Sequence, residues 1–235
     1  MAVSLSPAVD PASLAELNAQ FEHQDAASVV RWAARTWAPD LALTCSFGGS
    51  SGMVLLDLAL REDADIPILV LDTDLLFAET YALIEQIERH YRINVQRVRP
   101  GLSLDEQARL HGPALHERDP DACCGLRKVA PLAAALHPYA AWLTAVRRDQ
   151  SATRAATPIV SWNAKHSVVK ICPLATWSER EVWRYLHANK VPYNPLLDQG
   201  YTSLGCRTCT RLPNGDDPRS GRWAGFAKTE CGLHS

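Results

Sequence analysis

The sequence predicts an α/β protein with a doubly wound, mostly parallel sheet. Short apolar runs alternate with amphipathic helical stretches after about residue 40, a pattern typical of a parallel sheet covered by helices on both faces. A chain of 235 residues with 47% hydrophobic content is also able to bury one large core. We therefore expect a nucleotide-binding α/β domain at 41–200, a helical segment at 1–40 and a tail at 201–235.

The expected elements follow from local periodicity. Apolar residues at three- and four-residue steps predict two helices before the sheet, at 13–21 and 27–37. The elements expected after them are, in order, a strand at 41–47, a helix at 53–62, a strand at 66–72, a helix at 77–91, a strand at 93–99, a helix at 123–137 and a strand at 140–146. The tail is rich in glycine, polar and basic residues without a period, so we expect it to be flexible, loop-rich and able to fold over a site.

Composition argues against several classes of protein. The formal net charge of −2 gives no global reason to expect a nucleic-acid or membrane partner. The first residues lack a basic start followed by an apolar core, and no apolar run reaches 18 residues, so neither export nor membrane insertion is indicated. We expect a cytoplasmic protein. A homo-oligomer is compatible with the sequence.

Two loops at expected strand ends are candidate ligand sites, because ligands of parallel sheets bind at the carboxyl ends of the strands. The first loop, SFGGSSG, includes Ser46, Gly48 and Ser50, whose small side chains suit a phosphate group. The alternative is a simple turn. The second loop carries Asp72 and Thr73, which could accept an adenosine's hydroxyls or base edge or, alternatively, cap the next helix.

The seven cysteines favour metal, cluster or redox chemistry over disulfides in a reducing compartment. Cys123 and Cys124 are adjacent. Cys206 and Cys209 form a Cys-x-x-Cys pair, which completes the four thiolates of a [4Fe-4S] cluster or a structural Zn²⁺ site. The side chains of adjacent residues point in different directions. Two adjacent cysteines therefore bind two neighbouring irons of a cluster more easily than one metal ion, so the spacing favours a cluster. The alternative is that all four cysteines are buried thiols that bind no metal.

Basic residues surround the adjacent cysteines. If Asp119 caps the helix that follows it, Cys123 and Cys124 lie in the first turns, where the helix dipole favours thiolates. Arg127 and Lys128 each stand four residues after one of these cysteines, so each cation shares a helical face with a thiol. Cations near a helix start are unfavourable unless an anion compensates them, which indicates an anionic cluster and an anionic substrate.

A second basic group follows the strand expected at 140–146. It contains Arg147, Arg148 and Arg154, and arginine forks match the oxygens of phosphate and sulfate. At the carboxyl end of a strand this group indicates an anion clamp. A solvated charged loop is the alternative.

The tail ends with a cysteine in an unusual place. Cys231 is the fifth residue from the end of the sequence, with Lys228 and His234 as neighbours that favour a thiolate and Glu230 as one that opposes it. Such a residue is either a reactive thiol or a tail cysteine without a role.

Together these motifs resemble a known family. The segments CCGLRKVAPL, AVRRDQSATR, VPYNPLLDQGYTSLGCRTCTR, GRW and ECGLH closely resemble the assimilatory adenylyl-sulfate reductases, the iron–sulfur branch of the APS/PAPS reductase family, from about Ser46 to His234. The resemblance implies an adenine nucleotide alpha hydrolase-like fold. It also implies reduction of adenosine 5′-phosphosulfate (APS) to sulfite and AMP in sulfate assimilation, with thioredoxin or a similar dithiol as reductant.

The resemblance assigns roles to matching positions. The four paired cysteines match the ligands of one [4Fe-4S] cluster per subunit, and Cys231 matches the catalytic nucleophile. Lys128 matches the lysine that links cluster and substrate, and His234 the histidine after the nucleophile. Cys45 and Cys172 match neither role and are expected to be buried structural thiols. The expected substrate contacts are Ser46, Gly48, Ser50, Asp72, Thr73, Arg147, Arg148, Arg219 and Arg222.

These roles imply two chemical steps. The Cys231 thiolate attacks the sulfur of the mixed anhydride, which releases AMP and leaves an S-sulfocysteine. An external dithiol then frees the enzyme by thiol exchange and sulfite departs. A tail cysteine suits both steps, since it can meet a nucleotide and then a protein reductant. The cluster is expected to organise the site rather than to pass electrons.

Two departures from the family keep alternatives open. Asp74 stands where many relatives have glycine, and the SFGGSSG loop lacks the acidic residues of many relatives. A reductase for the 3′-phosphorylated substrate (PAPS), or one that accepts both, is therefore the nearest alternative. Less favoured are a tRNA-thiolating relative, which would need a full pyrophosphate loop, and a zinc module that binds nucleic acid, which the net charge does not support.

Overall fold

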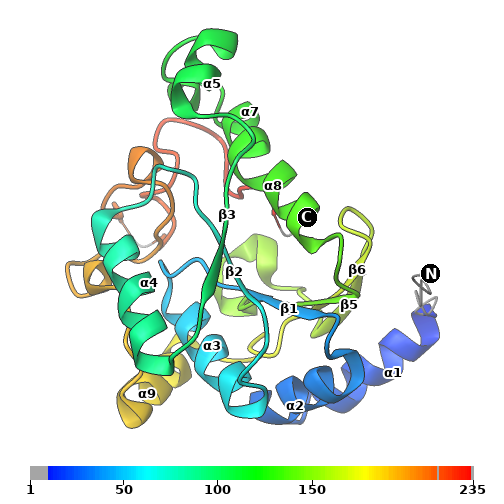
Figure 1. Ribbon diagram of the computed structural model, residues 1–235. Helices are drawn as coiled ribbons and strands as arrows, with labels where there is room; N and C mark the ends of the chain where they lie inside the picture. The colour runs from blue at the N-terminus through cyan, green and yellow to red at the C-terminus, as the bar shows by residue number, and fades with distance from the viewer. Residues whose placement is uncertain (1–9, 216, 234–235) are drawn as a thin grey trace. The chain divides into compact units, whose positions relative to one another are not determined.

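The computed structural model describes residues 10–215 and 217–233, which form an α/β fold (Figure 1). The α-helices are α1 (Pro11–Phe21), α2 (Ala26–Trp37), α3 (Ser50–Glu62), α4 (Ala78–Tyr91), α5 (Leu104–His111), α6 (Leu115–Arg118), α7 (Pro120–Cys124), α8 (Ala130–Leu136) and α9 (Glu179–Asn189). The strands are β1 (Leu41–Thr44), β2 (Ile68–Leu71), β3 (Val95–Val98), β4 (Ala141–Leu143), β5 (Val160–Asn163) and β6 (Val168–Ile171). Shorter helical turns are η1 (Gly125–Val129), η2 (Arg148–Gln150), η3 (Ala152–Arg154), η4 (Pro195–Leu197) and η5 (Arg207–Cys209).

The strands form one mixed sheet in the order β3-β2-β1-β4-β6-β5. The β1–β4 and β4–β6 pairs are parallel, with Leu41 opposite Ala141 and Ala141 opposite Val169. The last pair along this order, β5–β6, is antiparallel. The predicted α/β fold with a mostly parallel sheet is confirmed.

Three elements of the second half were missed by sequence analysis. Strands β5 and β6 form an antiparallel pair, and the side chain of Trp162 on β5 is exposed, as suits an edge strand. Helix α9 has a capping box in which the Ser178 hydroxyl accepts from Glu181 N and the Glu181 carboxylate accepts from Ser178 N. This box is a recognisable sequence signal for a helix start, so α9 was predictable.

The chain divides into two compact units, each built from several segments. The first unit comprises residues 10–45, 51–68 and 136–191 of the described chain. Its core includes the fully buried Trp142, whose Nε1 donates to Thr44 Oγ1 at 2.7 Å. Cys45 and Cys172 are both buried in this unit, as expected of structural thiols, and burial raises the pKa of Cys172 to about 11.

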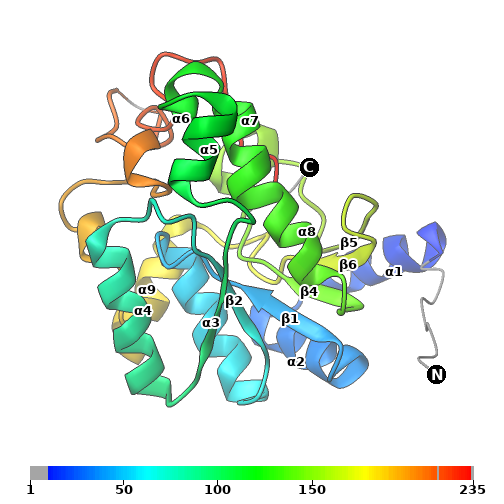
Figure 2. The ribbon, with the colours of Figure 1, turned by 45° about the horizontal axis from the view of Figure 1, so that its top comes forward.

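The second unit comprises residues 46–50, 69–135 and 192–233 of the described chain, and holds all four paired cysteines and Cys231. Its helices α5 to α8 follow one another closely in Figure 2, and the C-terminal segment runs beside α6 and α7 in both ribbon views. The tail contains no α-helix among its described residues, and a bridge between Thr210 and Arg222 closes it into a loop.

The helix expected at 123–137 is not continuous. It begins earlier, at Pro120, because the Asp119 carboxylate accepts a hydrogen bond from Ala122 N at 2.8 Å, which confirms the expected cap. Between α7 and α8 the chain forms the π-helical turn η1, in which Ala130 N donates to Gly125 O. A π-turn is wider than an α-turn, yet Arg127 and Lys128 still line one pocket with Cys123 and Cys124, as expected of cations that share a helical face with these cysteines.

No described helix combines the length and apolar character needed to cross a membrane.

Candidate active site

The four paired cysteines line one small pocket of the second unit. Cys123 and Cys124 come from α7, while Cys206 precedes the turn η5 and Cys209 is its last residue. The other lining residues are Leu75, Pro120, Arg127, Lys128, Thr208 and Trp223. The pocket therefore brings together two cysteine pairs that are more than 80 residues apart in the sequence.

The donor set of the pocket suits a metal centre. Among the described residues, no three cysteine, histidine or carboxylate side chains stand close enough to hold a single metal ion. A structural zinc ion takes four ligands at about 2.0–2.3 Å from one centre, whereas a [4Fe-4S] cluster takes four thiolates, each on a different iron. Four thiols in one pocket are the ligand set that either group uses.

The pKa shifts differ among the paired cysteines. Burial raises the pKa of Cys123 to about 11, and the neighbouring Cys124, Cys206 and Cys209 add to the rise. Burial also raises the pKa of Cys124, against the opposing effect of nearby cations. Burial also acts to raise the pKa of Cys206. Lys128, together with Thr73 and Arg222, outweighs this effect, so the pKa of Cys206 lies below its usual value.

Lys128 is the cation at the centre of this arrangement. It lies on η1 with only 8% of its surface exposed. Burial acts to lower its pKa, but the thiols of Cys206, Cys231 and Cys124 reverse the effect, and the pKa is raised. The ammonium group therefore keeps its charge, and that charge acts on the paired cysteines Cys206 and Cys124 as well as on Cys231.

The loop after β2 contributes a buried threonine that contacts one of the paired cysteines. Thr73 is fully buried, and its Oγ1 lies 3.3 Å from Cys206 Sγ. Asp72 is also buried, where its carboxylate accepts from the Tyr81 hydroxyl at 2.7 Å and from Asp74 N at 3.1 Å. Helix α4 has Phe77 at its N-cap, with no side-chain cap. The helix-cap alternative for Asp72 and Thr73 was therefore wrong.

Arg127 anchors this loop. Its guanidinium is 1% exposed and donates to Thr73 O at 2.7 Å, to Gln107 Oε1 and Leu102 O at 3.2 Å, and to the Asp74 carboxylate. Asp74 adopts a left-handed backbone conformation, with φ of 58°. Glycine adopts this conformation most easily, and in this chain an aspartate adopts it while balancing a buried charge.

Arg222 and Trp223 of the tail form another wall. The Arg222 guanidinium lies 4.4 Å from the centre of the Trp223 ring and donates to Ser203 Oγ and Leu204 O. A Cβ on Gly205 would lie 2.2 Å from Arg222 Nη2, so only glycine leaves room for the guanidinium. Trp223 is buried, and its Nε1 has no hydrogen-bond partner in the part of the chain that the structure describes. Because Trp223 lines the cysteine pocket, this unpaired donor belongs to a residue that borders the site.

The tail segment before Cys231 is also held in place. Arg219 Nη2 donates to Thr229 O at 2.8 Å and lies 3.3 Å from a carboxylate oxygen of Glu230. Cys231 itself is partly buried. The predicted His234 lies outside the described residues.

The first predicted loop has a packing role. Gly48 N donates to Ser46 Oγ at 3.4 Å, and Ser50 is already the first residue of α3. A Cβ on Gly48 would lie 2.9 Å from Leu204 Cβ, so glycine is required here for close packing. Contact of Ser46, Gly48 and Ser50 with a substrate stays a prediction.

The predicted arginine pair belongs to the first unit. Arg147 is buried, and its side chain bonds Asp149 at 2.8 Å and the Ser51 hydroxyl. Arg148 pairs through both terminal nitrogens with Glu22 and donates from Nε to Thr157 O at 2.9 Å. Both guanidinium groups are thus compensated by carboxylates, and their contact with a nucleotide stays a prediction.

Comparison with known proteins identifies the family. The phosphoadenosine phosphosulfate reductase domain matches residues 40–212. The chain belongs to this family. It is 45% identical over 221 residues to the adenosine 5′-phosphosulfate reductase of Halalkalibacterium halodurans, covering 93% of this chain and 95% of that protein. It is 48% identical over 224 residues to the enzyme of the same name from Salinibacter ruber, covering 94% and 88% respectively.

Solved structures agree with this family assignment. The phosphoadenylyl-sulfate reductase of Candida auris, solved with phosphate, has a TM-score of 0.75 and 31% identity, over 88% of this chain and 98% of that one. More distant likeness extends to the NH3-dependent NAD synthetase of Campylobacter jejuni, with a TM-score of 0.51, 8% identity, and coverage of 81% and 79%. The predicted reductase resemblance and the adenine nucleotide alpha hydrolase-like fold are both confirmed, and this reductase-family chain is an oxidoreductase.

Several residues of the reductase-family site were missed by sequence analysis. The contact of the Thr73 hydroxyl with Cys206 was not expected, while its contact with a nucleotide stays a prediction. Trp223 was noted only within the GRW motif, and no role was assigned to Asp121. A buried tryptophan between two basic residues is a signal of local packing, but nothing in the sequence indicated its neighbours.

Proposed function

We propose that this protein reduces adenosine 5′-phosphosulfate to sulfite and AMP, since its bacterial relatives are named adenosine 5′-phosphosulfate reductases. The observation that carries the proposal is the position of Lys128, a buried cation that acts on both Cys206 and Cys231. An anionic substrate whose sulfur is to be attacked by a thiolate needs such a cation nearby. The proposed setting is sulfate assimilation in the cytoplasm, where thiols stay reduced.

The cysteine pocket is proposed to hold one [4Fe-4S] cluster per subunit. Two observations support the fit: four thiols share the pocket, and the Trp223 indole N–H has no described partner. The proposed ligands are Cys123, Cys124, Cys206 and Cys209. When bound, the cluster would organise the surrounding side chains and contribute to the electrostatics of the site.

In the first step the Cys231 thiolate attacks the sulfur of the substrate. A bond forms between Cys231 Sγ and that sulfur, while the bond from sulfur to the bridging oxygen breaks and AMP leaves with the electron pair. Negative charge accumulates around the sulfur during this attack. Lys128 offsets it most directly, with Arg219 and Arg222 as the proposed further cations and His234 as a proposed participant next to the thiol.

In the second step the reductant, thioredoxin or a similar dithiol, restores the enzyme. One thiolate of the reductant attacks Cys231 Sγ, forms a mixed disulfide and expels sulfite. The second thiol of the reductant then breaks the mixed disulfide, so the reductant is oxidised to its disulfide and Cys231 returns as a thiol. The two electrons that reduce the sulfonyl group thus come from the dithiol.

The role of Cys231 is tested by intact mass after APS is added without reductant. The wild-type protein should gain the mass of one sulfonate group, whereas Cys231→Ser should gain none and should keep its cluster absorbance. The matched control is Cys172→Ala, which removes a buried thiol of the first unit and should leave adduct formation unchanged. An adduct on Cys231→Ser would reject the assignment.

A reductase for PAPS is the second candidate, favoured by the likeness to the Candida auris enzyme and by the name of the matched domain. Sulfite release measured in parallel with APS and PAPS decides between them. A preference for PAPS at equal concentration would overturn the proposed substrate while leaving the Cys231 chemistry in place.

A further inference from the structure

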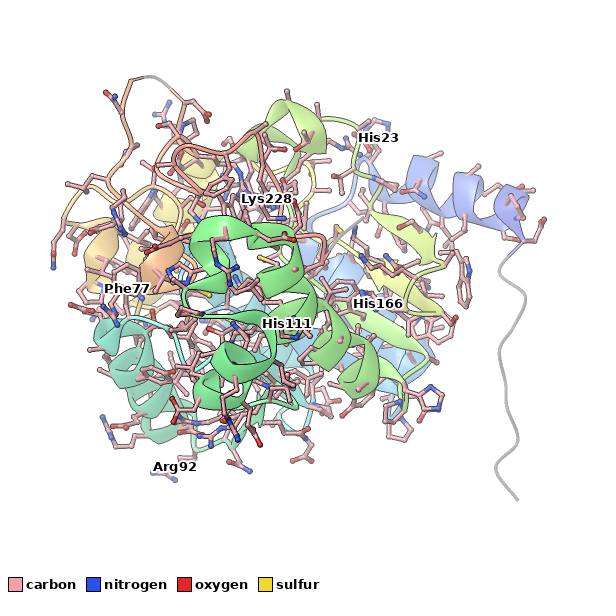
Figure 3. The ribbon with its side chains drawn as sticks, turned by 90° about the horizontal axis from the view of Figure 1, so that it is seen from above. His23, Phe77, Arg92, His111, His166 and Lys228 are labelled. Atoms are coloured by element: carbon pink, nitrogen blue, oxygen red, sulfur yellow. The ribbon has the colours of Figure 1, made fainter. Side chains whose placement is uncertain are left out.

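The segment that carries Cys231 is attached to the start of α7 by an ion pair. Lys228 Nζ bonds the carboxylate of Asp121, which stands in the first turn of α7. Figure 3 shows Lys228 beside this helical segment. The Lys228 side chain is 7% exposed, unusually low for a lysine, while that of Asp121 is 78% exposed. The pair therefore joins a buried ammonium to a carboxylate at the surface.

Lys228 is held from a second direction as well. Its Nζ lies 5.4 Å from the centre of the buried Trp223 ring, a cation–π arrangement. Its charge also acts on the Cys124 thiol, which places it close to the cysteine pocket. Asp121, Lys228 and Trp223 thus form a structure that we call the clasp. It connects the tail to the helix that presents two of the four paired cysteines.

The clasp lies only three residues before Cys231. Three residues of extended chain reach about 10 Å, so after release at Lys228 the position of the thiol would depend on the Arg219 contacts with Thr229 and Glu230. An attack on sulfur requires reacting atoms within about 3–3.5 Å, and small losses of position reduce the rate strongly. Because the Asp121 carboxylate is exposed to solvent and salt, the clasp is also weak enough to open reversibly.

We infer that Asp121 is a positioning residue that acts through Lys228. The closed clasp holds Cys231 near Lys128 for the attack on the substrate, and the open clasp releases the thiol to a protein reductant. The two chemical steps belong to the proposed function, on which this part of the inference rests. The physical part, that Asp121 restrains the tail at Lys228, is independent of the substrate.

Trypsin and iodoacetamide test the physical part on the full-length protein with its cluster. Trypsin needs an accessible Lys228, so Asp121→Asn should increase cleavage after Lys228, and alkylation of Cys231 should accelerate about two- to fivefold, the range expected of one exposed ion pair. Asp121→Glu, which keeps the charge, should restore both rates toward wild type. High salt should bring the wild type toward Asp121→Asn.

The matched control is Asp105→Asn, because Asp105 is also an exposed aspartate in the first turn of a helix, α5. It should change neither cleavage nor alkylation. Equal rates for Asp121→Asn, Asp105→Asn and wild type would overturn the clasp. Cluster absorbance, recorded for every variant, should be unchanged. If Asp121→Asn alone lost absorbance, its faster cleavage and alkylation would be due to a damaged cysteine pocket, and the positioning role would be overturned.

The chemical part is tested by single-turnover reactions. Asp121→Asn should slow adduct formation on Cys231 without slowing the release of sulfite from a preformed adduct by dithiol. A wild-type protein that forms no adduct would reject the proposed function, whereas the protease and alkylation results would still decide the clasp. Equal slowing of both steps would overturn the separate roles of the closed and open clasp.

Discussion

Cations are balanced differently in the two units of this protein. In the first unit Arg147 and Arg148 are each paired with a carboxylate, Asp149 and Glu22. In the second unit the electrostatic neighbours that support the charge of Lys128 are thiols. Each carboxylate serves one arginine, whereas Lys128 is shared among three thiolates, one of which belongs to the proposed nucleophile Cys231. The comparison teaches that the cation able to serve chemistry is the one whose partners include the proposed nucleophile rather than a carboxylate alone.

The strongest test of this comparison is Lys128→Ala. Removing a buried cation that acts on Cys231 should slow adduct formation by about 10²- to 10³-fold, the usual effect of removing one preorganised charge-stabilising group. Single-turnover kinetics followed by intact mass measure it. Lys128→Arg is the control that keeps the charge and should recover part of the rate. A full rate in Lys128→Ala would remove the distinction between the two units.

An intermediate case sharpens the comparison, because Arg127 lies in the second unit but is paired with Asp74. Asp74→Asn should destabilise the protein by about 1–2 kcal/mol, less than the loss of a fully buried partner, since Asp74 is partly exposed. Urea unfolding of the cluster-loaded protein gives the value. Glu85→Gln, on an exposed ion pair of α4, should change it by less than about 0.5 kcal/mol.

The smallest effect is expected from Glu22→Gln. The hydrogen bond from Arg148 holds the pKa of Glu22 below its usual value, against a small opposing effect of burial. A lowered carboxyl pKa stabilises the fold above about pH 4.5, and this contribution is lost as the pH falls through the folded-state pKa. The variant should therefore be less stable by about 0.5 kcal/mol at neutral pH, with the difference vanishing in acid, because the pair is exposed.

The measurement for Glu22→Gln is chemical unfolding at neutral pH and at successively lower pH. Adduct formation on Cys231 should equal that of the wild type. A difference in stability that persists unchanged into acid would show that Glu22 acts through packing rather than charge.

The features that the sequence predicted correctly have local causes. Helix α4 and strand β2 begin and end within two residues of the expected bounds, because their apolar periodicity is strong. The cap at Asp119 was recognisable from an aspartate followed by proline. Cysteine spacing alone indicated that two distant pairs share a site, since four thiols in two close pairs have few other uses.

The features that escaped prediction depend on distant contacts. Arg127 bonds Thr73 across 54 residues and Asp74 across 53, and no local pattern encodes those partners. The antiparallel direction of β5 is likewise set by pairing with β6. The pairing of Arg148 with Glu22 joins the expected helical segment to the expected nucleotide loop across 126 residues. In each case the residue types were visible and only the partners were not.

The π-turn η1 also determines what a deletion in this segment would do. An α-helix adds about 100° of rotation per residue, and a π-turn holds one more residue per hydrogen-bonded loop. Deleting one codon between Gly125 and Val129 would leave a regular helix, yet it would rotate everything before the deletion relative to α8. The number of residues in this turn is therefore inherited as part of the site, just as the identities of Lys128 and the cysteines are.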